Sequence, residues 1–135
     1  MKDYQQKRMK SYVMPQTVYR QALWAVKDLE RLRNKLAEMK QDAYVLDGFD
    51  LTMPSSGRGG RVYDVTGSKA VEIANLVRRI EAIELAFMTL PQEYRRGIEE
   101  KLVYGRPYDQ WAHSNTWKHW QQVFLYHVAV NLQLL

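Results

Sequence analysis

Four polar side chains on the last predicted helix have types and a spacing that suit hydrogen bonding to a nucleic acid. The capping cluster 114–116 precedes a helix whose apolar face is Trp117, Trp120, Phe124, Val128 and Leu132. The opposite face carries Asn115, Lys118, His119 and Gln122. Such donors and acceptors can address base edges or phosphates in a major groove. Because any amphipathic surface helix shows polar residues opposite its core face, that simpler interpretation stays open as well.

The residues that could catalyse a reaction or bind a metal lack a suitable spacing. His119 and His127 are eight residues apart, two helical turns, too far for one metal ion without a further ligand. Glu81, Glu84, Glu99 and Glu100 have arginines nearby and are expected to form solvated helix-surface pairs. The absence of cysteine excludes disulfides and thiolate chemistry. We therefore predict a binding protein rather than an enzyme, with no cofactor and no metal.

The charge of the chain is concentrated near its beginning. The net charge is +5, and residues 1–40 alone hold ten Lys/Arg against four Asp/Glu. This asymmetry favours an acidic partner, of which nucleic acid is the commonest. Tyrosines interleave with these cations (Tyr4, Tyr12 and Tyr19 among Lys7, Arg8, Lys10 and Arg20). That pattern could suit single-stranded nucleic acid, although an aromatic segment that packs against the helices is the simpler account.

Apolar periodicity predicts an all-α fold. Apolar or small residues recur at alternating intervals of four and three from Val18 to Ala43, which predicts one helix over 16–43. A second helix is expected at about 67–89, and the two should form a long antiparallel hairpin over 16–89. The connection 44–66 is predicted to be a flexible loop because it contains the Pro/Ser/Gly cluster 54–60. That cluster lacks the Lys-Ser/Thr ending of a phosphate-binding loop.

The segment 90–135 is expected to form a helix-turn-helix-like three-helix unit. A helix over 92–104 ends at Gly105, a short helix follows at 108–113, and the last helix closes the chain. Together with the hairpin it forms a single helical domain over 1–135. The first ten residues are polar and precede no apolar run, so we expect neither a signal peptide nor a spanning helix, and a cytoplasmic protein that does not enter a membrane.

The run LPQEYRRGI at 90–98, followed by YGRPY at 104–108 and by 116–135, resembles the region-four end of phage sigma-like regulators of the RinA/ArpU type. The resemblance extends to 66–70 and 79–84. It implies a small prophage transcriptional regulator that binds double-stranded DNA at phage promoters through its last helix. By position, Thr116 opens the recognition helix, Lys118, His119 and Gln122 are exposed, and Trp120 and Phe124 lie in the core.

Other cations and other partners complete the expected interface. Arg95, Arg96 and Arg106 are expected to add phosphate contacts to those of Asn115 and the recognition helix. Host RNA polymerase and a second copy of the chain are further candidate partners. The alternative is a helical protein–protein interaction or dimerisation module without DNA reading, favoured by the regular apolar spacing and by Trp111, Trp117 and Trp120.

Overall fold

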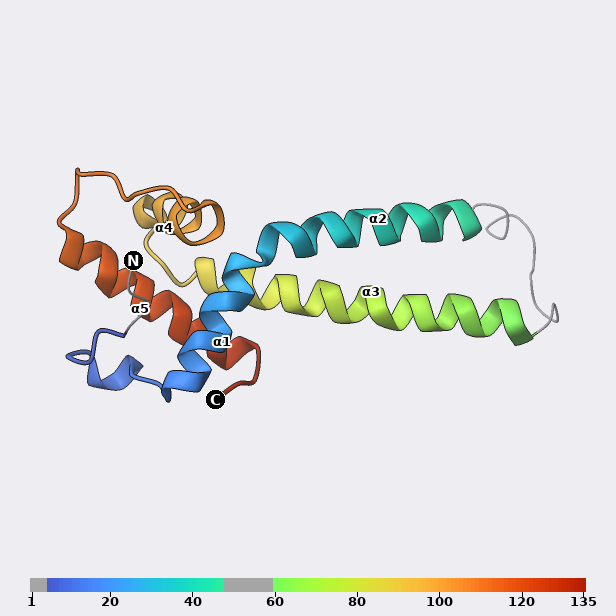
Figure 1. Cartoon of the computed structure of the whole chain (residues 1–135), viewed down its shortest axis with the longest axis horizontal. Helices are drawn as coiled ribbons and strands as arrows, with labels where there is room; N and C mark the ends of the chain where they lie inside the picture. Colours follow the sequence, from blue (N-terminus) through green and yellow to red (C-terminus); the bar gives the residue numbers. More distant parts are fainter. Residues whose placement is uncertain (1–4, 48–59) are drawn as a thin grey trace. The chain divides into compact units, whose positions relative to one another are not determined.

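The computed structural model describes residues 5–47 and 60–135, with side chains over 5–42 and 67–135. All regular elements in these residues are helical, which confirms the predicted all-α class (Figure 1). They are the 3-10 helix η1 (Lys10–Tyr12) and the α-helices α1 (Gln16–Lys27), α2 (Leu29–Asp47), α3 (Gly60–Phe87), α4 (Gln92–Tyr104) and α5 (Ser114–Asn131).

The first predicted helix is two helices, because the chain breaks at Asp28. The prediction of one helix over 16–43 was wrong in this respect, although Ala22, Ala25, Leu29 and Leu32 of its apolar seam are buried. Aspartate is a poor residue inside a helix, since its carboxylate competes for nearby backbone N–H groups. Asp28 is the C-cap of α1, where its backbone N–H bonds to the Trp24 carbonyl, and α2 begins at the next residue, Leu29.

The predicted loop 44–66 is shorter than expected. Helix α2 continues to Asp47 and α3 begins at Gly60, so the backbone of 44–47 and 60–66 is helical. Once a helix is nucleated, each further residue adds a backbone hydrogen bond, so a helix can extend beyond its apolar seam. Most of the Pro/Ser/Gly cluster lies outside the described residues, and its predicted flexibility stays a prediction.

The chain divides into two compact units, and the predicted single domain over 1–135 stays a prediction. The first contains residues up to Glu30 together with Glu81–Leu135, and the second is Arg31–Ile80. The first unit therefore holds η1, α1, α4, α5 and the last turns of α3, whereas the second consists of most of α2 and α3. The antiparallel hairpin stays a prediction, and all residues of the predicted DNA interface belong to the first unit.

The core of the first unit forms around α5. Helix α1 crosses α5 (Figure 1), and the rings of Phe87 and Phe124 stack with centroids 4.2 Å apart. Trp117 is only 1% exposed and lies against α4, where Gly97 makes room for it. A Cβ atom at Gly97 would lie 2.4 Å from Cη2 of Trp117. The indole thus packs directly on the backbone of α4, which only a glycine permits.

The predicted short helix at 108–113 is absent, so two helices rather than three form the segment 90–135. Gly105 ends α4 in the left-handed conformation with φ 72°, as predicted. After it, side chains hold the connection to α5 in place: Tyr108 stacks on Trp117 at 4.7 Å, and Trp117 Nε1–H donates to the Asp109 carbonyl over 2.9 Å. The nine residues 105–113 also exceed the three to four residues of the usual turn in this motif.

We predict that Gly97→Ala destabilises the first unit. The added methyl must displace the Trp117 ring, at a cost of about 1–3 kcal/mol that exceeds the helix-propensity gain of up to ~1 kcal/mol. Urea denaturation followed by tryptophan fluorescence measures this loss. The matched control is Gly67→Ala in α3, where a Cβ would meet nothing within 4 Å. Gly67→Ala should raise the temperature at which the helical signal is lost. An equal response of the two variants would contradict the packing of Trp117 on α4.

Candidate nucleic-acid interface

Residues 5–14, here called the N-terminal segment, form a closed loop whose two ends are joined by the side chain of Gln5. Its Oε1 accepts a hydrogen bond from the Met14 N–H over 2.7 Å, and its Nε2 donates to the Met14 carbonyl over 2.7 Å. Both Gln5 and Met14 are buried. One amide therefore satisfies both backbone groups of Met14 and fixes the two ends of the segment beside each other.

The side chain of Gln122 binds the N-terminal segment to α5. The side chain is only 2% exposed; its Oε1 accepts from the Gln6 N–H over 3.1 Å, and its Nε2 donates to the Tyr12 carbonyl over 2.6 Å and to Gln5 Oε1 over 3.3 Å. The prediction that Gln122 is an exposed DNA contact was therefore wrong. The N-terminal segment covers this side of α5 because its backbone polar groups, once buried, need partners that the glutamine amide provides.

Most of the other residues of α5 that were predicted to contact DNA are exposed, and they lie in its first two turns. Asn115, Lys118 and His119 are exposed, whereas Thr116 and Trp120 are half-buried and Phe124 is fully buried. The helix starts at Ser114, and His113 rather than the cluster 114–116 caps it: its Nδ1 accepts from the Asn115 N–H over 3.0 Å. The exposure of Lys118 and His119 and the burial of Phe124 confirm those parts of the prediction.

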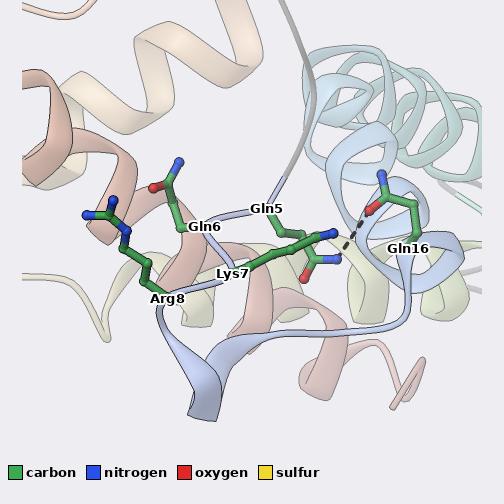
Figure 2. A pocket seen from close by; sticks show the side chains of 5 residues that line it. All are labelled: Gln5, Gln6, Lys7, Arg8 and Gln16. Carbon is green, nitrogen blue, oxygen red and sulfur yellow. Dashed lines mark hydrogen bonds between the residues drawn. The ribbon is translucent and has the colours of Figure 1, made fainter.

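Two adjacent hollows join these residues to the N-terminal segment. The α5 hollow, of about 420 Å³, is lined by Asn115, Lys118, His119, Gln6, Arg8 and Met9. The α1 hollow, of about 560 Å³, is lined by Gln5, Gln6, Lys7, Arg8 and Gln16. Figure 2 shows Lys7 reaching toward Gln5 and Gln16 while Arg8 points away from them. Gln6 and Arg8 belong to both hollows, so a surface from the start of α5 to the start of α1 is continuous.

This surface is cationic, and none of the described residues that line it is acidic. Residues 5–27 contain Lys7, Arg8, Lys10, Arg20 and Lys27, residues 110–135 contain Lys118, and neither stretch contains an Asp or Glu. The described residues around either hollow include no carboxylate. The sequence did not predict that Arg8 lies beside Lys118, since 110 positions separate the two; the absence of acidic residues from both stretches was the one signal it carried.

The three predicted arginines on and after α4 have other partners. Arg95 Nε donates to the Leu90 carbonyl over 3.0 Å and Nη2 to the Met88 carbonyl over 3.3 Å, which stabilises the turn between α3 and α4. Arg96 and Arg106 both pair with Glu100, at 3.2 Å and 3.6 Å. Glu93, Glu100 and Asp109 also line a hollow of about 270 Å³ beside Arg96. Nearby carboxylates thus offset the positive charge around α4. A phosphate contact by these arginines stays a prediction.

The remaining polar groups of this region serve packing. The Tyr108 hydroxyl donates to Gln121 Oε1, and burial, with a smaller contribution from Tyr19, raises the pKa of the Tyr108 phenol above its ordinary value. Tyr108 therefore stays a neutral donor. Among the side chains described, those of residues 5–42 and 67–135, no three of His, Asp or Glu gather closely enough to hold a metal ion. Over the same part of the chain, no helix has the length and apolar character needed to cross a membrane.

We predict that Gln122→Leu releases the N-terminal segment from α5. The substitution leaves the Tyr12 carbonyl and the Gln6 N–H without their amide partner, and a buried polar group without a partner costs about 1–3 kcal/mol. Amide hydrogen exchange should therefore become faster over residues 5–14, and the free energy of unfolding should fall by a similar amount. Gln110→Leu, at an exposed position, is the control. Unchanged protection of the segment in Gln122→Leu would refute the role given to this amide.

No family model, no curated protein and no solved structure matches this chain.

Proposed function

We propose that this protein binds double-stranded DNA as a phage or prophage transcriptional regulator, with host RNA polymerase as a further partner, as the resemblance in its sequence implies. The observation that carries the proposal is the cationic α5 hollow, where Arg8 and Lys118 line one surface from opposite ends of the chain. Neither cation has an acidic partner among the described residues. Two unopposed cations beside a helix start suit a phosphodiester group.

The chemistry of the hollow supports phosphate binding at several points. The Arg8 guanidinium can donate two parallel hydrogen bonds to a phosphate, and Lys118 adds a compact positive charge. The first turn of α5 contributes the positive end of the helix dipole, while its Asn115 and Thr116 N–H groups already bond to the His113 side chain and carbonyl. The Asn115 side-chain amide is a further donor at the same turn. Such contacts provide affinity and orientation on DNA, independently of base sequence.

The proposed mode of binding differs from the predicted one in how α5 meets DNA. With Gln122 buried, the polar face of α5 open to solvent is confined to its first two turns, where Asn115, Lys118 and His119 lie. Residues at the start of a recognition helix are the usual readers of base edges. We therefore propose that α5 presents only its first turns to a groove while the N-terminal segment contacts the neighbouring phosphates.

The test is the salt dependence of DNA binding, measured by fluorescence anisotropy with duplexes from phage promoters and with unrelated duplexes of equal length. Each neutralised phosphate contributes about 0.9 to the slope of log K against log salt, so Arg8→Ala/Lys118→Ala should reduce the slope by about 2. Lys35→Ala/Lys40→Ala makes the same charge change at exposed positions of α2 and should leave the slope unaltered. Equal losses in both double variants would show diffuse attraction and contradict the proposed site.

A second candidate function is self-association without DNA reading. It is favoured by two exposed apolar side chains at the end of α3: Leu85 in its last turn, 60% exposed, and Met88 directly after the helix, 62% exposed. Light scattering distinguishes the two candidates. A dimer that is insensitive to salt and has no affinity for DNA would favour this function, whereas a monomer that forms a salt-dependent DNA complex would exclude it.

A further inference from the structure

Trp24 on α1 is exposed to water to an unusual degree for an indole. Its side chain is 62% exposed, although tryptophan is among the residues that gain most from burial. The helix around it buries the opposite side, with Tyr19, Ala22, Leu23, Ala25 and Val26 in the core. An open indole on an otherwise well-packed helix needs an explanation from what it could bind.

The neighbours of Trp24 on the exposed side of α1 are polar or cationic. Gln16, Arg20, Trp24 and Lys27 follow one another at intervals of four, four and three residues, so they lie along one side of the helix. The Nζ atom of Lys27 lies 4.7 Å from the centroid of the Trp24 ring, in a cation–π contact. Arg20 is exposed one turn earlier. We call Gln16, Arg20, Trp24 and Lys27 the α1 stripe.

The α1 stripe is continuous with the cationic hollows. Gln16 is both the first residue of α1 and a lining residue of the α1 hollow, beside Lys7 and Arg8 (Figure 2). At 1.5 Å per residue, Gln16 and Trp24 are separated by about 12 Å along the helix. A stacked strand rises about 3.4 Å per nucleotide, so this span corresponds to about three or four nucleotides. A strand with one phosphate in the hollow can therefore present a base to Trp24.

The tyrosines in this part of the chain cannot serve as the platform. Tyr19 is 1% exposed, and Tyr12 packs edge-to-face on Tyr126 with ring centroids 5.2 Å apart. The interpretation that these tyrosines pack against the helices is therefore confirmed for both of them. Among the aromatic residues of the described range 5–27, Trp24 alone is exposed, with the Lys27 ammonium over its ring.

We infer that Trp24 is a stacking platform for an unpaired base, so that the protein prefers nucleic acid with a short single-stranded stretch beside the phosphate held in the hollow. This inference rests on the proposed nucleic-acid binding and names the form of nucleic acid that is bound. Base–aromatic stacking is tolerant of sequence, and the cations of the α1 stripe follow the backbone of the strand.

The polarity of the stripe favours a nucleic acid over a membrane or a protein partner. A membrane-binding helix face or a protein hot spot surrounds its tryptophan with further apolar side chains. The residues one turn from Trp24 are Arg20, Gln21, Lys27 and Asp28, and Thr17 lies beyond them, so none of these side chains is a large apolar one. An indole with a cation on each side, at Arg20 and Lys27, suits stacking on a charged polymer.

The test compares affinities for a labelled oligothymidylate of about ten nucleotides and for a duplex of the same length, measured by anisotropy at one salt concentration. Trp24→Ala should weaken single-strand binding by about 5- to 150-fold, the effect expected for loss of one stacked base, and leave duplex affinity unchanged. Trp24→Phe should restore most of the loss because it keeps a ring. Trp111→Ala removes another indole, 57% exposed, and should change neither affinity. Circular dichroism verifies that each variant is folded.

The outcomes separate this inference from the proposed function. If the wild-type protein binds duplex through Arg8 and Lys118 but Trp24→Ala binds the single strand as well as the wild type, only the stacking role of Trp24 is overturned. If the wild type binds neither nucleic acid, the proposed function fails and the inference with it. Binding of phosphatidylserine/phosphatidylcholine vesicles that is lost in Trp24→Ala, without single-strand affinity, would assign the indole to a membrane surface instead and overturn the inference.

Discussion

The arrangement of the candidate interface depends on the buried amide of Gln122. A glutamine amide without partners in a protein core is costly, and so are the buried backbone groups of a loop. Here each satisfies the other: Gln122 binds the backbone of Gln6 and Tyr12 and the side chain of Gln5, which in turn holds Met14. These contacts fix the N-terminal segment on α5 in one register. Arg8 is thereby brought beside Lys118, across 110 positions of the sequence.

The same contacts explain why α5 differs from an ordinary amphipathic helix. Gln121, Gln122, Val123, Phe124 and Leu125 are all buried, and five consecutive residues occupy every side of a helix. Phe124 meets Phe87, Gln122 meets the N-terminal segment, and Gln121 accepts from Tyr108. The middle of α5 is thus enclosed, while its first two turns carry Lys118 and His119 at the surface. Only the first turns of such a helix, and not its whole length, are available to contact a DNA groove.

The sequence could predict those parts of the fold that depend on interactions between residues close together in the chain. Helix α4 was predicted over 92–104 with Gly105 as its end, because apolar spacing and a C-terminal glycine are local signals. The absence of the short helix at 108–113 depends on tertiary contacts, such as the stacking of Tyr108 on Trp117, that periodicity does not register. The break at Asp28 depends on one residue of low helix preference within a regular apolar seam, which periodicity does not register either. Gln122 was misassigned for a related reason. A polar residue on a helix is ordinarily exposed, and only the distant Gln5 and Tyr12 make its burial favourable.

The distribution of charge and of the indole also bears on which form of nucleic acid this surface suits. Around α4, Arg96 and Arg106 share Glu100 and Arg95 binds backbone carbonyls, so the cations of the candidate interface without a described acidic partner lie on the N-terminal segment and at the start of α5. In an intact duplex the base faces are stacked on one another, so Trp24 has nothing to stack on and only the hollows can act. Where the strands separate, as they must when a promoter opens, an unpaired base becomes available within reach of Trp24. If the proposed DNA binding holds, cations that attract phosphate in either form and an indole that stacks only on the open form together favour the separated strands.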